Sequence, residues 1–136
     1  MNKVLIIEDD PMYRKIYTRK FEVSGYQVDS AENGLIGLDK IRSFQPNIIF
    51  VDLMMPIMDG FQFLDRYKAD PSSQHIPIVV LTNLSTVNDS QKVLQKGALA
   101  LLVKSDTEPN AVVEKANEIL AKQQPSGPTL QISPNA

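Results

Sequence analysis

The chain alternates short apolar runs with longer segments of helical character. One run, Tyr26–Ser30, is more polar than the others and predicts a strand at the edge of a sheet. The other four are continuously apolar and predict strands buried on both faces, as in a parallel sheet. These four runs are Val4–Ile7, Ile48–Val51, Ile78–Leu81 and Leu99–Val103. The pattern therefore predicts an α/β protein.

Helix signals fill the segments between the apolar runs. Asp10 can cap a helix, Pro11 suits its first position, and Gly25 ends it after about Ser24. Another helix follows the turn at Asp59-Gly60. Two more helices have several possible caps and a recognisable apolar stripe. The first of them begins at Asn33 or Gly34, and its inward side chains are Leu35, Ile36, Leu38 and Ile41. The other is the last helix of the chain, which begins at Asp106 or Thr107 and has Pro109 in its first turn. Its inward side chains are Ala116, Ile119 and Leu120.

The helix predicted over Asn88–Lys96 has a thin apolar face. Its inward side chains are mainly Val93 and Leu94, and Gly97 ends it. A helix that buries few side chains opens easily. We therefore expect this helix to be the least firmly held of the five.

Strand and helix alternate five times, which fixes the expected architecture. Right-handed crossovers then give a doubly wound (βα)5 protein with a five-stranded parallel sheet. With the polar second strand at one edge, the flavodoxin-like order 2-1-3-4-5 follows. The 136 residues fit one domain, which we place at residues 1–122. Residues 123–136 are rich in Pro, Gly, Ser and Gln, and we expect a flexible C-terminal tail there.

Composition narrows the possible functions. The chain has no Cys and one His, which excludes disulfides, thiolate metal sites and sites that need several histidines. A formal net charge of −2 argues against direct binding to nucleic acid, which needs a basic surface. No apolar run approaches the ~20 residues of a membrane span. We expect a cytoplasmic protein with no membrane contact, and we expect the single histidine, His75, to lie on the surface.

Polar residues follow four of the predicted strands. Glu8 and Asp9 follow the first strand, Asp52 the third, Thr82 the fourth and Lys104 the fifth. In such sheets ligands bind beyond the carboxyl ends of the strands, so these side chains should meet. Crowded carboxylates need a cation, and oxygen-only ligands indicate Mg²⁺, or Mn²⁺ as a substitute. An aspartate beside such a cation can attack phosphorus and form an aspartyl phosphate, with Thr82 and Lys104 binding phosphoryl oxygens.

The same residues resemble a known family. Ile6-Ile7-Glu8-Asp9-Asp10, the stretch Phe50-Val51-Asp52-Leu53-Met54-Met55-Pro56-Ile57-Met58-Asp59-Gly60, then Val80-Leu81-Thr82 and finally Lys104 look like the receiver domain of two-component response regulators of the chemotaxis-regulator type. The resemblance covers about Lys3 to Lys122. It implies a signalling switch rather than an enzyme with an external substrate.

The resemblance also implies a role for each matching position. Asp52 would accept a phosphoryl group from a sensor histidine kinase or a phosphotransfer protein, with Thr82 as the switch hydroxyl and Lys104 as the phosphate-pairing cation. Asp9 would bind Mg²⁺ directly and Glu8 through a water; Asp52 and the backbone carbonyl of Met54 would complete the ligand set. A downstream effector would bind the face formed by the fourth helix, the fifth strand and the fifth helix.

Three positions depart from the pattern of this family. Leu101 stands where many receivers have an aromatic residue, which puts the usual aromatic switch in doubt. Ser105 replaces the proline that often follows the lysine, so we expect a trans bond after Lys104. Asn83 stands where a small residue is usual and would crowd the approach to Asp52.

Met54 and Leu84 border the path of a hydrolytic water and are both apolar, which predicts slow autodephosphorylation.

Two other functions stay open on the sequence. A pseudo-receiver would bind partners without phosphotransfer, and Leu101 and Ser105 favour it slightly. A Mg²⁺-dependent phosphohydrolase would turn over an aspartyl phosphate, but Met54 stands where its second catalytic acid is expected. Nearby acidic residues have structural interpretations, since Asp10 fits a helix cap and Asp59 with Gly60 fits the shape of the loop after Asp52.

Overall fold

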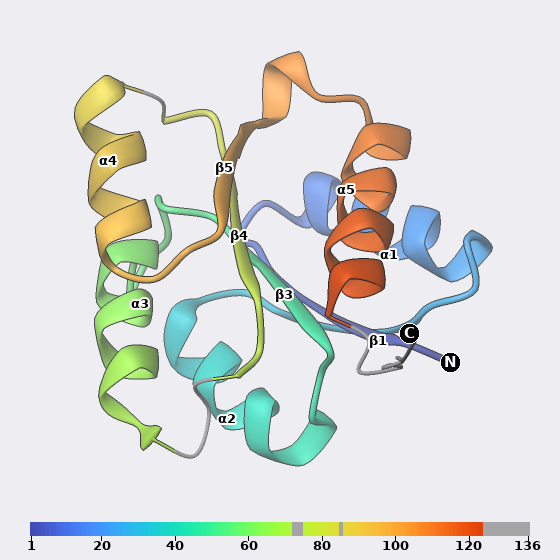
Figure 1. The fold of residues 1–136 in the computed structure, drawn as a ribbon, viewed down its shortest axis with the longest axis horizontal. Helices are drawn as coiled ribbons and strands as arrows, with labels where there is room; N and C mark the ends of the chain where they lie inside the picture. Colours follow the sequence, from blue (N-terminus) through green and yellow to red (C-terminus); the bar gives the residue numbers. More distant parts are fainter. Residues whose placement is uncertain (72–74, 85, 124–136) are drawn as a thin grey trace, which may run out of the picture.

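The computed structural model describes residues 1–71, 75–84 and 86–123, which form one parallel sheet between two layers of helices (Figure 1). The strand order is β2-β1-β3-β4-β5, so the predicted flavodoxin-like α/β fold is confirmed. Of the predicted tail, all but Gln123 lies outside the described residues. The strands are β1 (Lys3–Ile7), β2 (Gln27–Ala31), β3 (Ile48–Val51), β4 (Ile78–Thr82) and β5 (Ala100–Val103).

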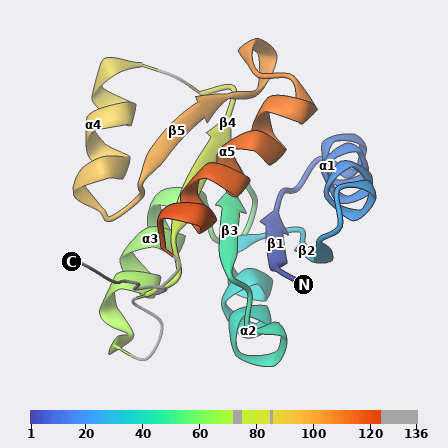
Figure 2. The same ribbon diagram turned by 45° about the vertical axis from the view of Figure 1, so that its right-hand side comes forward.

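The helices divide between the two faces of the sheet. Helices α2, α3 and α4 cover one face, and α1 and α5 cover the other (Figure 2). Their bounds are α1 (Pro11–Val23), α2 (Gly34–Phe44), α3 (Gly60–Ala69), α4 (Val87–Gln95) and α5 (Pro109–Lys122), with a short 3-10 helix, η2 (Lys104–Asp106), after β5. Among the described residues, no helix has the length and hydropathy required to cross a membrane.

Strands β1 and β3 supply side chains to both cores. Successive residues of a strand point to opposite faces. Leu5 and Ile7 of β1 therefore pack with α2 and α3, whereas Val4 and Ile6 pack with α1 and α5. All four are essentially inaccessible to solvent, as the continuous apolar pattern predicted.

Several predicted helix ends are confirmed in detail. Asp10 caps α1 by accepting a hydrogen bond from Met12 N at 2.9 Å. Asn33 caps α2, and Asp59 forms a capping box with Gln62 at the start of α3. Gly25, with a φ of 94°, takes the left-handed conformation that ends α1.

Some sequence predictions were wrong at the outer elements. Strand β5 is half-buried rather than buried on both faces, because it is the last strand of the sheet and lacks a neighbour on one side. Leu35 of α2 and Leu94 of α4 were expected to face the core, but they are 46% and 50% exposed. The last helix is preceded by Glu108, so neither Asp106 nor Thr107 caps it. Asp106 instead lies in η2.

Candidate functional site

The carboxyl ends of four strands form an open pocket of about 370 Å³. Strand β1 ends before Glu8, β3 before Asp52 and β5 before Lys104, while Thr82 is the last residue of β4. The pocket lies beside β1, whose two neighbours are β2 and β3; this is where the strand order reverses and where sheets of this class bind ligands. Ten residues line it: Glu8, Asp9, Asp10, Tyr13, Asp52, Met54, Thr82, Asn83, Leu84 and Lys104. The structure thus brings together every predicted site residue.

Three carboxylates meet in this pocket. Glu8, Asp9 and Asp52 each offer one oxygen, and these oxygens all lie within 4.8 Å of one another. Glu8 and Asp52 are buried, whereas Asp9 is exposed. A tight cluster of oxygen donors without nitrogen or sulfur fits Mg²⁺ or Mn²⁺. These three residues could therefore hold a divalent cation that remains open to solvent on the side of Asp9.

Lys104 connects two of the three carboxylates. Its Nζ lies 2.5 Å from Glu8 Oε1 and 2.8 Å from Asp52 Oδ2. The lysine is only 8% exposed, so both ion pairs are largely shielded from water. Buried pairs of this kind depend on good geometry to offset the cost of desolvation. Here each carboxylate also keeps a backbone hydrogen bond, since Glu8 Oε2 accepts from Asp10 N and Asp52 Oδ1 accepts from Leu53 N.

Burial and charge shift the ionisation of this cluster. Burial raises the pKa of Glu8 to about 7, and the neighbouring Asp52 adds to the rise, while the hydrogen bond with Lys104 opposes it. Burial acts to lower the pKa of Lys104, but its hydrogen bonds with Asp52 and Glu8 outweigh this effect and raise the pKa above its usual value. Lys104 therefore stays charged across the physiological range of pH.

Hydrogen bonds on both sides hold Asp52 at the end of β3. Its own N–H donates to Ile7 O at 3.0 Å, and its Oδ1 accepts a 2.7 Å hydrogen bond from Leu53 N. The loop that follows returns so closely that a Cβ on Gly60 would lie 2.3 Å from Asp52 O. Only glycine fits there, which agrees with the structural role predicted for Asp59 and Gly60. Met54 lines the pocket and is 64% exposed.

The loop after β4 faces Asp52 across the pocket. Thr82 is buried, and its Oγ1 accepts a hydrogen bond from Leu84 N at 3.2 Å. Asn83 lines the pocket, but its Oδ1 accepts a hydrogen bond from Ser105 N at 2.9 Å. This bond joins the ends of β4 and β5. The described residues contain no cis peptide bond, so the bond between Lys104 and Ser105 is trans, as predicted.

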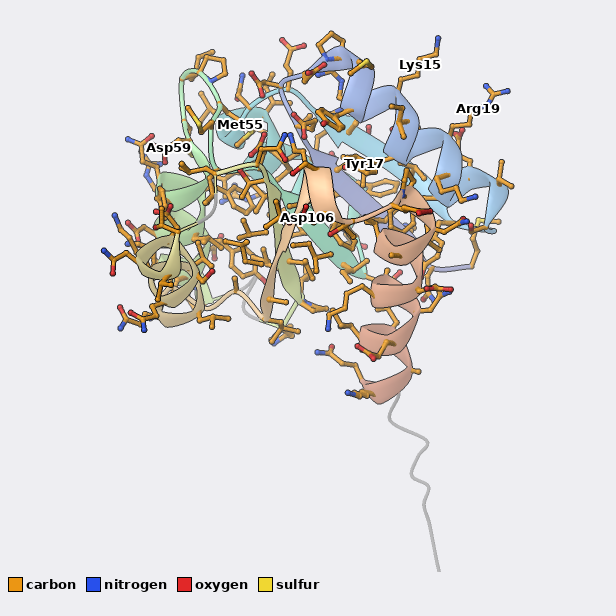
Figure 3. All side chains as sticks on the ribbon, turned by 90° about the horizontal axis from the view of Figure 1, so that it is seen from above. Lys15, Tyr17, Arg19, Met55, Asp59 and Asp106 are labelled. Atoms are coloured by element: carbon orange, nitrogen blue, oxygen red, sulfur yellow. The ribbon has the colours of Figure 1, made fainter. Side chains whose placement is uncertain are left out.

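Two residues of α1 belong to this site and escaped the sequence analysis. Lys104 Nζ lies over the ring of Tyr13, 4.4 Å from its centroid, and Arg14 Nη1 donates to Glu8 O at 2.8 Å. Figure 3 looks onto this edge of the sheet and shows that Tyr17 points inward from α1, whereas Lys15 and Arg19 point outward. The spacing of Tyr13, Tyr17 and Phe21 at every fourth residue is the signal that could have placed Tyr13 on the inner face. His75 is exposed, as predicted.

Comparison with known protein families gives a single result. The sequence model of the response regulator receiver domain matches residues 4–124 of this chain. The chain is 29% identical to the polar-differentiation response regulator DivK of Brucella anthropi over 109 residues, which cover 80% of this chain and 89% of DivK. It is 35% identical over 104 residues to the DNA-binding dual master transcriptional regulator RpaA of Synechocystis, covering 76% of this chain. That match spans only 43% of RpaA.

Solved structures agree with this result. The chemotaxis protein CheY4 of Vibrio cholerae superposes with a TM-score of 0.81 at 27% identity, covering 88% of this chain and 98% of CheY4. A CheY-like response regulator receiver domain protein of Methanospirillum hungatei superposes with a TM-score of 0.83, also at 27% identity, covering 93% of this chain and 99% of that protein. The match of the family model, over residues 4–124, includes the strand ends that form the pocket.

Proposed function

Because this chain belongs to the response regulator receiver family, we propose that it is a phosphoacceptor switch of two-component signalling in which Asp52 carries the phosphoryl group. The donor would be a phosphohistidine on a sensor histidine kinase or a phosphotransfer protein. We assign this role to residues 1–122 and regard 123–136 as a tail outside the domain. The observation that carries the proposal is the position of the Asp52 carboxylate, 2.8 Å from Lys104 Nζ and within 4.8 Å of the carboxylate oxygens of Glu8 and Asp9.

The proposed reaction is a direct transfer. A carboxylate oxygen of Asp52 attacks the phosphorus, the bond between phosphorus and the imidazole nitrogen breaks, and the nitrogen keeps the electron pair. The hydrogen bond from Leu53 N holds the carboxylate in place during the attack. Lys104 binds a phosphoryl oxygen, and the Thr82 hydroxyl, whose oxygen accepts from Leu84 N, donates its own proton to another.

The carboxylate cluster would hold Mg²⁺, with Mn²⁺ as a substitute. Asp9 and Asp52 would be direct ligands, Glu8 would act through a water, and the backbone carbonyl of Met54 would be a further ligand. When bound, the cation supplies positive charge that offsets the carboxylates and the incoming phosphoryl oxygens. The exposed position of Asp9 supports this assignment, because the cation then keeps a side open to the donor.

The output surface would be the face formed by α4, β5 and α5. Val87 and Leu94 of α4 and Leu99 before β5 are large apolar residues at 75%, 50% and 51% exposure, which suits contact with an effector protein. Signalling through a protein partner in the cytoplasm, without direct contact to nucleic acid or membrane, agrees with the net charge of −2. Leu101 replaces the usual aromatic residue of β5, so the change on this face would involve an aliphatic side chain.

Intact mass after incubation with Mg²⁺ and acetyl phosphate tests the proposal. The wild-type protein should gain one phosphoryl group, and Asp52→Asn should gain none, because an amide is a far poorer nucleophile. Asp59→Asn is the matched control, since it makes the same change seven residues later and asparagine still caps α3. No adduct on the wild type would favour a pseudo-receiver. Release of inorganic phosphate without a lasting adduct would favour a phosphohydrolase.

A further inference from the structure

The ammonium of Lys104 contacts an aromatic ring as well as two carboxylates. Its Nζ is 4.4 Å from the centroid of the Tyr13 ring, 2.5 Å from Glu8 Oε1 and 2.8 Å from Asp52 Oδ2. A lysine ammonium has three N–H donors. The carboxylates account for two of them, and the ring covers a further side of the ammonium. The ring face carries negative electrostatic potential, so this contact is attractive and strengthens where water is excluded.

Tyr13 is itself held by the core. Its ring stacks on Tyr17, with centroids 5.9 Å apart and planes 12° from parallel. Tyr17 is 2% exposed and packs in the core between the sheet, α1 and α5. The two tyrosines are one helical turn apart, so they share a face of α1. A continuous line of contacts therefore runs from the core through Tyr17 and Tyr13 to Lys104.

We propose that Tyr13 is a positioning residue for Lys104: its ring keeps the ammonium over Asp52 while the carboxylate partners of that ammonium change. The inference rests on the proposed role of Asp52. When Asp52 accepts a phosphoryl group, its carboxylate becomes an acyl phosphate and Lys104 must turn from a carboxylate oxygen to a phosphoryl oxygen. The ring makes no hydrogen bond for which the phosphoryl oxygens compete, so it remains in contact with Nζ throughout the exchange.

Two substitutions separate the ring from the rest of the side chain. Tyr13→Phe keeps the aromatic face and removes only the hydroxyl, whereas Tyr13→Met fills similar space without an aromatic face. With acetyl phosphate and saturating Mg²⁺, Tyr13→Phe should be phosphorylated within about twofold of the wild-type rate, and Tyr13→Met about tenfold more slowly. Phe44→Leu is the control. It removes the ring paired with Lys3, at 5.5 Å and at the opposite end of the sheet, and should react at the wild-type rate.

A second measurement tests the positioning without phosphorylation. In metal-free protein, protons of an ammonium held over a ring face resonate upfield, so the ¹H–¹⁵N signal of Lys104 Nζ should be shifted upfield in wild type and Tyr13→Phe. Methionine has no ring current, so in Tyr13→Met the ¹⁵N relaxation of Nζ is measured instead, and it should show a more mobile ammonium than in wild type and Tyr13→Phe. This readout separates loss of positioning from general destabilisation, because a variant that is merely less stable but still folded keeps the ammonium as ordered as in wild type.

The outcomes are distinct. Slow phosphorylation and a more mobile Lys104 ammonium in Tyr13→Met, together with wild-type behaviour in Tyr13→Phe, would support the proposal. A wild-type rate in Tyr13→Met, or a rate in Tyr13→Phe as slow as in Tyr13→Met, would overturn it. If the wild type itself accepts no phosphoryl group, the proposed function of Asp52 fails; the mobility of the ammonium in the three proteins then still decides whether the Tyr13 ring positions Lys104.

Discussion

At the scale of single residues, the site contains more negative than positive charge. Lys104 pairs with Glu8 and Asp52, while the third carboxylate, Asp9, remains exposed to solvent. One ammonium cannot offset three carboxylates, but the raised pKa of Glu8 comes first from its burial and only then from the charge of Asp52. This raised pKa makes the stability of the metal-free protein depend on pH.

Glu8 should make the metal-free protein less stable as pH rises from about 4.5 to about 7. Its pKa is raised in the folded state from 4.5 to about 7, so over this range the folded state binds a proton that the unfolded state has released. The proton bound to Glu8 stabilises the folded state fully below pH 4.5, and this stabilisation is lost as pH rises to about 7. Glu8→Gln should flatten this part of the profile, measured as the free energy of unfolding by urea with EDTA present.

Glu118→Gln is the control for this measurement. Glu118 is exposed beside Lys115, and its hydrogen bond with that lysine lowers its pKa. A lowered pKa makes stability increase as pH rises, so removing Glu118 cannot flatten the decline that Glu8 causes. A profile in Glu8→Gln as steep as in the wild type would show that another group causes the decline.

Met54 and Leu84 should make the phosphorylated protein long-lived. Both line the pocket beside Asp52, and neither side chain can orient a water toward the phosphorus. The double variant Met54→Asn, Leu84→Glu should therefore lose its phosphoryl group faster, by an order of magnitude or more, since positioned acid–base groups contribute roughly 10²–10⁴-fold. The measurement is the decay of the phosphorylated mass after the donor is removed. Equal decay in wild type and variant would show that the water is not limiting.

At the scale of elements, the structure couples the loops after β4 and β5. Asn83 Oδ1 accepts a hydrogen bond from Ser105 N, the first backbone group after Lys104. This contact gives structural meaning to two departures from the family pattern, because a proline at 105 would have no N–H and an alanine or glycine at 83 would have no side-chain acceptor. The two positions thus form a complementary pair that ties Lys104 to the loop of Thr82.

Asn83→Ala and Ser105→Pro should therefore be non-additive. Each change removes one partner of the same bond, at a cost of about 1 kcal/mol, and the double variant should cost little more than one of them. The free energies of unfolding of the wild type, the two single variants and the double variant give the coupling energy between positions 83 and 105. Simple additivity of the two costs would mean that the bond contributes nothing.

Helix α4 should open before the other helices. Val93 is its one buried residue, whereas α3 buries four and α5 buries four. Few buried side chains mean a low free energy of local opening. Amide hydrogen exchange should therefore be fastest in α4, and phosphorylation of Asp52 should change exchange there most. Uniform exchange across the five helices would contradict this ranking.

At the scale of the whole molecule, binding of Mg²⁺ should stabilise the fold. A cation that binds the folded site and not the unfolded chain adds about 2.7 kcal/mol at a hundred times its dissociation constant. The thermal midpoint should therefore rise with Mg²⁺ concentration, and Asp9→Ala should abolish most of the rise. Asp39→Ala, an exposed aspartate in α2, should keep it. A midpoint unaffected by saturating Mg²⁺ would contradict the proposed ligand set.

Most of the fold was predictable because its strands and helix ends are marked by patterns of residues that are close together in the sequence. Continuous apolar runs such as Ile48–Val51 identify strands, and residues such as Asp10 and Gly25 mark helix ends. The meeting of Asp52 and Lys104 followed from the rule that parallel strands end at one edge. The half-burial of β5 was implicit in the strand order but overlooked. The contact of Tyr13 with Lys104 was not predictable, since it joins residues 91 positions apart and depends on how α1 packs against the sheet.

The division of β1 between two cores limits how the chain can change in length. Val4 and Ile6 face one layer of helices and Leu5 and Ile7 the other, and Glu8 follows directly. Deleting one residue from this strand would turn every residue before the deletion to the opposite face of the sheet. These side chains would then point into the wrong layer of helices, or Glu8 would be displaced from the pocket. Insertions and deletions of single residues should therefore be tolerated in loops at the opposite edge of the sheet, whereas within β1 and β3 the number of residues is as restrictive as their identity.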